Sequence, residues 1–313
     1  MKKLLRNRWF LCLAGVLLFM PGWYGMTGLT LFGALVPLLL INHSYDSSKR
    51  SFWRVAGWSA LTFVLWNVTC TWWVWNASPA GVAASSVVEM VLFTTAFAIY
   101  HFVSKRAKPH IAYIILVCGW LAAEYVYLTW QASFPWILLG NGFANDTWAV
   151  QWYSVTGVFG GSLWVLIVNI MLFEAVVKRS KKWLYRAGGT VVLPLVVSLV
   201  IFWTYREPAG EKGTITVVQP NLDSYTEKFE LPQSVQNDLM LSLARQAPAD
   251  VDLIAFPETS VEDNIWEHDM AASPSVTQFI EYMRAYYPGA QAITGATTYR
   301  CYPDGVGKSK TER

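Results

Sequence analysis

Charged residues and paired cysteines are both scarce in this sequence. Asp, Glu, Lys and Arg make up 14% of the 313 residues, whereas 54% are hydrophobic. Ordinary soluble domains carry about 25% charged residues, so this composition argues against a purely water-soluble protein. No CxxC spacing occurs, so neither a zinc site nor a disulfide framework is indicated, and we expect no metal. The four cysteines are Cys12, Cys70, Cys118 and Cys301.

The net charge of +3 is unevenly distributed along the chain. Residues 1–204 contain 15 Lys and Arg against five Asp and Glu, whereas residues 205–313 contain nine against 16. An apolar, basic part followed by a polar, acidic part predicts a membrane domain, residues 1–205, joined to a water-facing domain, residues 206–313. The second part has no basic stripe, so we expect no nucleic-acid partner.

The first part contains several long apolar runs. A membrane crossing needs roughly 20 apolar helical residues, so we predict a multipass α-helical membrane domain of about seven helices. The predicted segments are 9–20, 26–41, 56–77, 81–103, 110–130, 156–177 and 188–204. The short first segment and its basic start also fit a cleaved signal peptide, although no small-x-small cleavage site follows.

Basic residues occur in alternate loops of this predicted domain. They precede the first segment and follow the second, fourth and sixth, while the intervening loops contain none. Lys and Arg collect on the cytoplasmic side of membrane proteins. The pattern therefore predicts a cytoplasmic amino terminus and places the residues after Tyr205 outside, which in a bacterial cell means the periplasmic side.

Two carboxylates, Glu89 and Glu124, lie inside predicted membrane segments, where burial of a charge is costly. One interpretation is that each bonds to a nearby polar group. The expected partners are Asn67 or Thr71 for Glu89, and Trp130 or Gln131 for Glu124. The alternative is a transporter that uses both carboxylates, but no internal repeat or matched pair of broken helices supports it.

The predicted outer loop from Gln131 to Val155 has a single charged residue, Asp146, and is rich in Trp, Phe, Gly and Pro. We predict that it lies on the bilayer surface. It then either admits a lipid chain to a site above the membrane or covers the helix ends.

The second part has the alternating pattern of an α/β layer. Strands are predicted at Thr214–Val218, Leu253–Phe256 and Gln291–Thr294, and helices at Ser234–Ala247 and Ser275–Tyr286. The expected apolar positions of the first helix are Val235, Leu239, Leu243 and Ala244.

Glu258 follows the second predicted strand directly, in the segment Phe256-Pro257-Glu258. The carboxyl ends of strands are where α/β folds place their sites, and partial desolvation there favours use of a carboxylate as a general base. The alternative is that Glu258 and Thr259 only begin a loop or cap a helix.

Short motifs in both parts carry a resemblance to a known family. In the membrane part they are Leu35-Val36-Pro37-Leu38-Leu39, Gly119-Trp120 with Glu124, Phe134-Pro135-Trp136, and Ser154 through Gly160 to Asn169. In the second part they are Val218-Gln219-Pro220-Asn221, Lys228-Phe229, Phe256-Pro257-Glu258-Thr259 and Ile293-Thr294-Gly295. In this order they resemble the apolipoprotein N-acyltransferases, bacterial inner-membrane enzymes with a nitrilase-like (αββα sandwich) periplasmic domain.

The resemblance implies a ping-pong acyl transfer through a Glu, Lys and Cys triad, with no cofactor. The family's cysteine takes an acyl chain from a phospholipid acyl donor as a thioester, and the amino group of an apolipoprotein's diacylglyceryl-cysteine then accepts it. Glu258 matches the family's general base. Phe229 falls where the family places an aromatic residue beside the acyl-chain entrance, which implies a role in substrate binding.

The sequence departs from this pattern because no lysine lies between Glu258 and Cys301. Lys308 and Lys310 come too early to match the family's lysine. We therefore expect the lysine and cysteine beyond Arg313, an incomplete nitrilase-like domain, and no catalysis by residues 1–313 alone. The alternative is a non-catalytic membrane protein that uses a nitrilase-like half-domain for binding or assembly.

Overall fold

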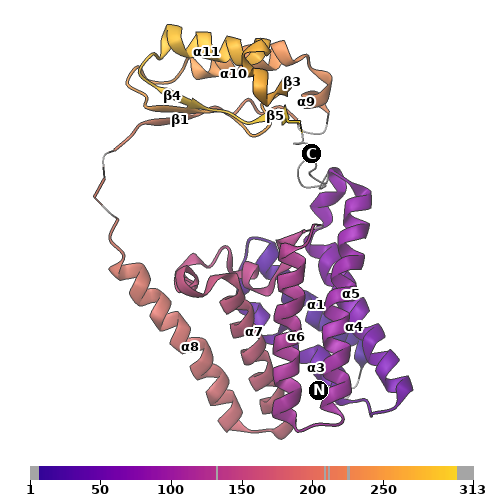
Figure 1. Cartoon of the computed structure of the whole chain (residues 1–313). Helices are drawn as coiled ribbons and strands as arrows, with labels where there is room; N and C mark the ends of the chain where they lie inside the picture. The colour runs from indigo at the N-terminus through magenta and orange to yellow at the C-terminus, as the bar shows by residue number, and fades with distance from the viewer. Residues whose placement is uncertain (1–6, 132, 208, 211, 224–225, 302–313) are drawn as a thin grey trace. The chain divides into compact units, whose positions relative to one another are not determined.

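The chain forms two compact units, Met1–Arg206 and Glu207–Arg313, each with its own hydrophobic core. The computed structural model describes residues 7–301, apart from residues 132, 208, 211, 224 and 225. The first unit is helical and the second combines helices with short strands (Figure 1).

The helices of the first unit overlap all of the predicted membrane segments. They are α1 (Arg8–Phe19), α2 (Leu31–Ala34), α3 (Val36–His43), α4 (Lys49–Cys70), α5 (Pro79–Ser104), α6 (Pro109–Thr129), α7 (Tyr153–Lys178) and α8 (Lys181–Thr204). Among the described residues, four helices, α5 to α8, are long and apolar enough to cross a membrane. Two apolar stretches, Arg8–Trp23 and Gly28–His43, are shorter. Seven crossings therefore stay a prediction.

Aromatic side chains form the centre of the helical core. Phe19 of α1 stacks on Trp66 of α4 with ring centroids 4.2 Å apart, and Phe93 of α5 lies 4.5 Å from Trp120 of α6. All four side chains are fully buried. The large contact areas of these rings hold the helices together, even though the outer surface of the unit is also apolar.

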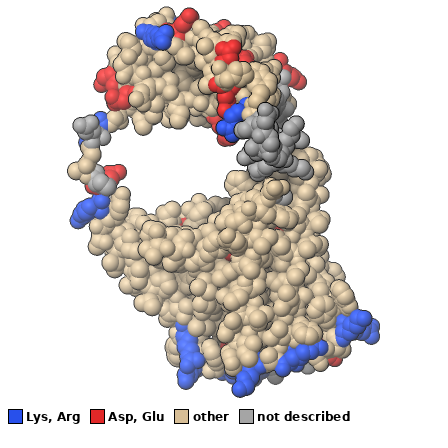
Figure 2. Space-filling model, viewed as in Figure 1, with Lys and Arg blue, Asp and Glu red and all other residues tan. Residues whose placement is uncertain are grey.

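Lys and Arg side chains gather at one end of the helical unit, as Figure 2 shows. This basic end carries the connections from α3 to α4, from α5 to α6 and from α7 to α8. Arg8, at the start of α1, lies over the ring of Tyr45 in the first of these connections, 4.1 Å from the ring centroid. The alternation of basic loops in the sequence thus becomes one basic end in three dimensions.

The segment between α6 and α7 is not confined to the surface, and the prediction for it was wrong in this respect. It forms 3₁₀ turns at Pro135–Ile137, Leu139–Phe143 and Thr147–Ala149. The side chains of Ile137, Leu139 and Phe143 are fully buried in the core. Asp146 is buried too, and it accepts a hydrogen bond of 2.6 Å from the backbone of Gly28. These contacts favour the interpretation that the segment covers helix ends.

The second unit contains the predicted strands and helices. Its elements are β1 (Ile215–Val217), α9 (Glu227–Glu230), α10 (Gln233–Ala244), β2 (Leu253–Ala255), β3 (Val261–Trp266), α11 (Pro274–Tyr286), β4 (Gln291–Ile293) and β5 (Ala296–Tyr299). β1, β2 and β4 form a parallel sheet in that order. Ile254 of β2 and Phe279 of α11 belong to the core of this unit.

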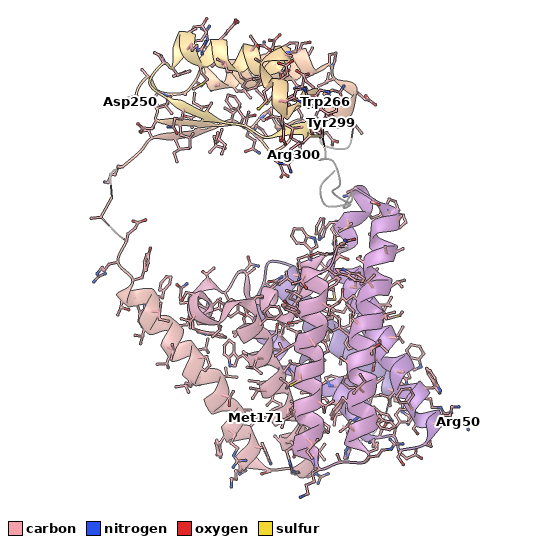
Figure 3. The ribbon with its side chains drawn as sticks, viewed as in Figure 1. Arg50, Met171, Asp250, Trp266, Tyr299 and Arg300 are labelled. Atoms are coloured by element: carbon pink, nitrogen blue, oxygen red, sulfur yellow. The ribbon has the colours of Figure 1, made fainter. Side chains whose placement is uncertain are left out.

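A second parallel ladder, β3 with β5, was not predicted. The rings of Trp266 and Tyr299 lie side by side on these two strands, 5.7 Å apart (Figure 3). α10 and α11 lie on one face of the sheet (Figure 1), whereas Ile215, Val217 and Ile293 are exposed. Within the described residues the unit is therefore a sheet with helices on one face, and the full αββα sandwich is not confirmed.

Candidate active site

The candidate site lies at the carboxyl edge of the three-stranded sheet. Val217, Ala255 and Ile293 end the three strands in register. Parallel pairing continues past β2, because Phe256 donates its backbone N–H to Ile293 at 2.9 Å. The segments that follow β1, β2 and β4 therefore meet, which brings Glu258 to the edge where the sequence predicts it.

A pocket of about 260 Å³ opens at this edge. Polar groups contribute much of its lining, and Lys228 and Glu258 are its two charged residues. The pocket is lined by Gln219, Pro220, Asn221, Leu222, Lys228, Gln236, Met240, Pro257, Glu258 and Ser260. Glu258 is exposed rather than partly desolvated as predicted, because β4 and β5 beside its loop are themselves exposed.

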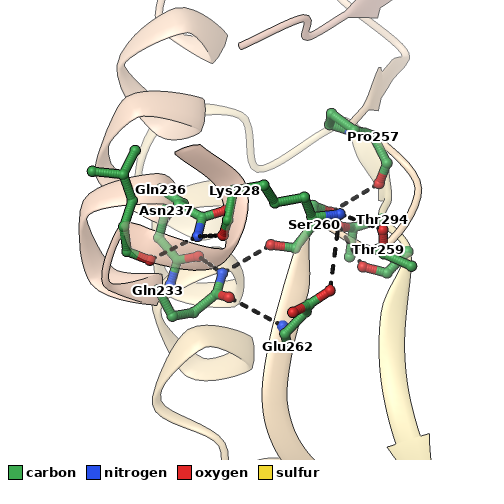
Figure 4. Close-up of polar contacts among 11 residues, drawn as sticks. Lys228, Gln233, Gln236, Asn237, Pro257, Thr259, Ser260, Glu262 and Thr294 are labelled. Carbon is green, nitrogen blue, oxygen red and sulfur yellow. Dashed lines mark hydrogen bonds and ion pairs between the residues drawn. The ribbon is translucent and has the colours of Figure 1, made fainter. Parts of the chain in front are cut away.

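Lys228 from α9 reaches the loop that carries Glu258 (Figure 4). Its ammonium group donates a hydrogen bond of 2.5 Å to the hydroxyl of Thr259 and lies 3.9 Å from the carboxylate of Glu262. The amide of Gln236 donates to the backbone oxygen of Lys228 at 2.8 Å, which ties α9 to α10. A cation is thereby placed beside the Glu258 loop and in the same pocket.

Two pocket segments have left-handed backbone at residues other than glycine: Asn221 with φ of 53° and Thr259 with φ of 51°. Asn tolerates this conformation, but a β-branched residue such as Thr rarely adopts it. Gly295 follows β4 and packs against the same turn. A side chain at Gly295 would place its Cβ 2.5 Å from the backbone nitrogen of Thr259. The backbone around Glu258 is therefore held in one uncommon conformation, as is frequent at functional sites.

Polar side chains at the start of α10 support this turn, and the sequence patterns did not predict them. Gln233 donates to the backbone oxygen of Ser260 at 2.8 Å and accepts from the backbone N–H of Glu262 at 3.1 Å. The hydroxyl of Ser260, just before β3, is hydrogen-bonded at 2.5 Å to that of Thr294, just after β4 (Figure 4). The only signal in the sequence is the run of polar residues at the start of α10.

Asp263 of β3 fixes the start of α11. Its carboxylate accepts hydrogen bonds from the Ser273 hydroxyl at 2.9 Å and from the backbone N–H of Ser275 at 3.2 Å. Partial burial alone raises the pKa of Asp263, but hydrogen bonds from Ser275 and Ser273 outweigh it, so the net pKa is lowered. The ionised carboxylate therefore holds α11 on the second ladder.

The other residues singled out in the sequence do not join Glu258 in the described structure. Phe229 belongs to α9, but its side chain lies outside the described residues, so its predicted role is untested. Cys301 is exposed beyond the end of β5, and Lys308 and Lys310 lie outside the described residues. Among the residues that the structure describes, no group of three His, Cys, Asp or Glu side chains is placed to hold a metal ion.

The two carboxylates of the helical unit have local partners. Glu89 of α5 accepts a hydrogen bond from the amide of Asn67, as predicted. Glu124 of α6 does not bond to Trp130 or Gln131. It accepts instead from the indole of Trp120 at 3.1 Å and from the backbone N–H of Leu139 at 2.9 Å. The prediction failed because Leu139 approaches Glu124 only when the segment after α6 folds back into the core.

The fold is that of a membrane protein with an appended α/β unit, and a carboxylate lies in a pocket at the carboxyl edge of the sheet, where α/β folds place their sites. The sequence model described as the apolipoprotein N-acyltransferase N-terminal domain matches residues 9–171. The chain belongs to the apolipoprotein N-acyltransferase family.

Two curated relatives support this assignment, and both are named as acyltransferases. The chain is 27% identical over 237 residues to the apolipoprotein N-acyltransferase of Chlorobaculum tepidum, which covers 73% of this chain and 44% of that protein. It is 22% identical over 244 residues to the apolipoprotein N-acyltransferase of Geobacter metallireducens, covering 72% of this chain and 46% of that protein. The chain thus spans less than half the length of the curated relatives it matches.

Proposed function

We propose that this chain supplies the membrane domain and the general base of an enzyme that N-acylates bacterial lipoproteins. The observation that carries the proposal is the position of Glu258, on a constrained turn beside a pocket that also contains Lys228. Family membership supports this reaction class, and the position of a carboxylate beside a pocket at the carboxyl edge of the sheet supports Glu258 as the base.

In the proposed reaction a cysteine thiolate attacks the ester of a phospholipid acyl donor. The thioester forms, and the lysophospholipid leaves as its alcohol. The free amino group of an apolipoprotein's diacylglyceryl-cysteine then attacks the thioester, an amide forms, and the thiol is released. Glu258 takes the proton from the thiol and passes it to the departing lysophospholipid oxygen. It then takes a proton from the attacking amine and returns it to the released thiolate. The cysteine and its partner lysine are proposed to lie outside residues 1–313. Phe229 is proposed to lie beside the entrance for the acyl chain.

The charge distribution supports a bacterial inner-membrane location for the helical unit. Its basic end is proposed to face the cytoplasm. α8 begins at that end with Lys181 and finishes at Thr204. The second unit, proposed as the periplasmic domain of residues 206–313, then follows on the side where diacylglyceryl-modified lipoproteins are exposed.

The experiment that tests the proposal follows an acyl chain. The gene product that contains residues 1–313 is purified in detergent and given a phospholipid with labelled acyl chains and a peptide that begins with diacylglyceryl-cysteine. We expect label in an amide at the amino group of the peptide. Release of all the label as free fatty acid would instead indicate a hydrolase and would contradict the proposal.

Gly295→Ala is expected to lower this transfer by a factor of roughly 10 to 100, because displacing a catalytic group by about 1 Å has effects of this size. The added Cβ would lie 2.5 Å from the backbone nitrogen of Thr259 and 2.9 Å from Cα of Glu258, so the turn must move. The measurement is the rate of label transfer. Gly289→Ala is the matched control, because a Cβ at Gly289 meets nothing within 4 Å. Equal rates for both variants would contradict a need for the observed turn.

A further inference from the structure

A large apolar groove of about 710 Å³ runs along the surface of the helical unit. Its walls come from α1, the α2–α3 segment, α7 and the start of α8. Representative lining residues are Ala14, Leu40, Leu172 and Leu184. None of the partners of Glu89 or Glu124 belongs to this lining, so the groove is separate from the polar clusters inside the unit.

The groove begins at the basic end of the unit and has the depth of one leaflet. Phe10, beside Arg8 on α1, lines it, and so does Leu18, eight residues further along the same helix. At 1.5 Å per residue this separation is about 12 Å. One leaflet contributes about half of a hydrocarbon core that is roughly 30 Å thick. The groove therefore matches the length of acyl chain that one leaflet offers.

Two cations, Arg179 and Lys181, line the basic end of the groove. The neighbouring Lys178 is paired with Glu174 at 2.5 Å. By contrast, no hydrogen bond or ion pair joins the side chain of Arg179 or Lys181 to any described residue. Both are exposed, so they can reach an anion at the membrane surface.

Arg179 also has an uncommon backbone for its residue type. It ends α7 in the left-handed conformation, with φ of 50° and ψ of 41°. Helices that end in this way usually have Gly at this position, because a side chain there is sterically unfavourable. An arginine therefore stands where the backbone favours glycine, and its side chain reaches the rim of the groove. The turn after α7 therefore carries a cation at the rim of the groove, where a glycine would carry none.

We propose that the groove binds an anionic phospholipid, with one acyl chain against α1, α3 and α7 and the phosphate held by Arg179 and Lys181. A guanidinium group binds phosphate oxygens in a bidentate manner, and Lys adds a second positive charge. The site is distinct from the proposed acyl transfer. α8 starts at the groove and has 24 residues. Its carboxyl end, where the chain leaves the helical unit, therefore lies about 36 Å from the groove along the helix. The lipid is bound as an intact, non-reacting ligand of the leaflet at the basic end.

The test is native mass spectrometry of the full chain in detergent, with phosphatidylglycerol or phosphatidylethanolamine added. We expect a saturable one-to-one adduct with phosphatidylglycerol. Its affinity should fall by roughly tenfold or more in the double variant Arg179→Gly, Lys181→Gln. The matched control is Arg50→Gln with Arg54→Gln, which removes two cations outside the groove and should leave the affinity unchanged. Arg179→Gly should preserve the end of α7, so loss of folding does not obscure the result.

A second pair of variants tests the apolar part of the site. Ala14→Phe fills the groove and should weaken the adduct, whereas Leu17→Phe, on an exposed position of α1 outside the lining, should not. Three results would each overturn the proposal. The first is equal binding of the two lipids, and the second is equal lipid affinity of the two charge variants. The third is displacement of the lipid by inorganic phosphate together with unchanged lipid binding by Ala14→Phe. A protein dimer in place of the lipid adduct would overturn it as well. None of these measurements requires acyl transfer, so failure of the lipid-binding proposal can be distinguished from failure of the proposed function.

Discussion

Replacing Glu258 by Gln is expected to reduce acyl transfer by roughly 100-fold or more, the usual contribution of a general base. Glutamine has nearly the same shape and hydrogen-bonding reach as glutamate but cannot take a proton from a thiol or an amine. Glu258 is exposed, so the substitution leaves no unpaired buried group and should not unfold the second unit. The measurement is the rate of label transfer from phospholipid to the diacylglyceryl peptide.

Glu267→Gln is the matched control for this variant. Glu267 is a carboxylate of the same unit, but it lies beyond β3, 3.9 Å from Arg300, and does not line the pocket. Its replacement should leave the rate within about twofold of the unaltered protein, as is usual for surface changes. If Glu258→Gln and Glu267→Gln transferred label equally well, Glu258 would not be the base.

Glu124→Ala is expected to lower the free energy of unfolding of the helical unit by roughly 2 to 5 kcal/mol. The substitution leaves the backbone N–H of Leu139 and the indole N–H of Trp120 without an acceptor, at about 1 to 3 kcal/mol for each buried group. Glu124 is fully buried, so the change also leaves a cavity. The measurement is the midpoint of thermal unfolding of the full chain in detergent.

Glu124→Gln separates a structural role from transport. The amide keeps an oxygen that can accept from Leu139 and Trp120, so we expect a loss of about 1 kcal/mol or less. If Glu124→Ala unfolded at the same midpoint temperature as the unaltered protein, the structural role of Glu124 would be contradicted. Proton-coupled uptake that Glu124→Gln abolishes, without any change in stability, would support a transporter instead.

Two strands of the second unit could be predicted from short segments of the sequence alone. The strands that end before Gln219 and Pro257 are short apolar runs followed by turn-forming residues, and both lie where they were predicted. The ladder of β3 and β5 was missed because β3, with the sequence VEDNIW, has charged residues and no clear alternation. Its pairing depends on β5, whose partner residues come 33 to 35 positions later, and no local pattern encodes that register.

The buried face of α10 shows why the polar side chains that hold the candidate site in place could not be predicted from the sequence. Apolar periodicity placed Val235 on the inner face, yet Val235 is 48% exposed and Gln236 and Asn237 are buried. Asn237 donates to the hydroxyl of Ser275 at 2.7 Å, and Gln236 reaches the backbone of Lys228. Burial of polar side chains is favourable only when distant partners satisfy them. Those partners come from α9 and α11, so the helix is rotated relative to its apolar pattern.

The most direct test of the account is the mass of a lipoprotein's amino-terminal peptide in living cells. The cells are bacteria depleted of their own N-acyltransferase that express the gene product containing residues 1–313, either unaltered or with Glu258→Gln. The account predicts an amide-linked acyl chain on the diacylglyceryl-cysteine with the unaltered protein and a free amino group with the variant. A free amino group in both, with the protein present in the membrane, would contradict it.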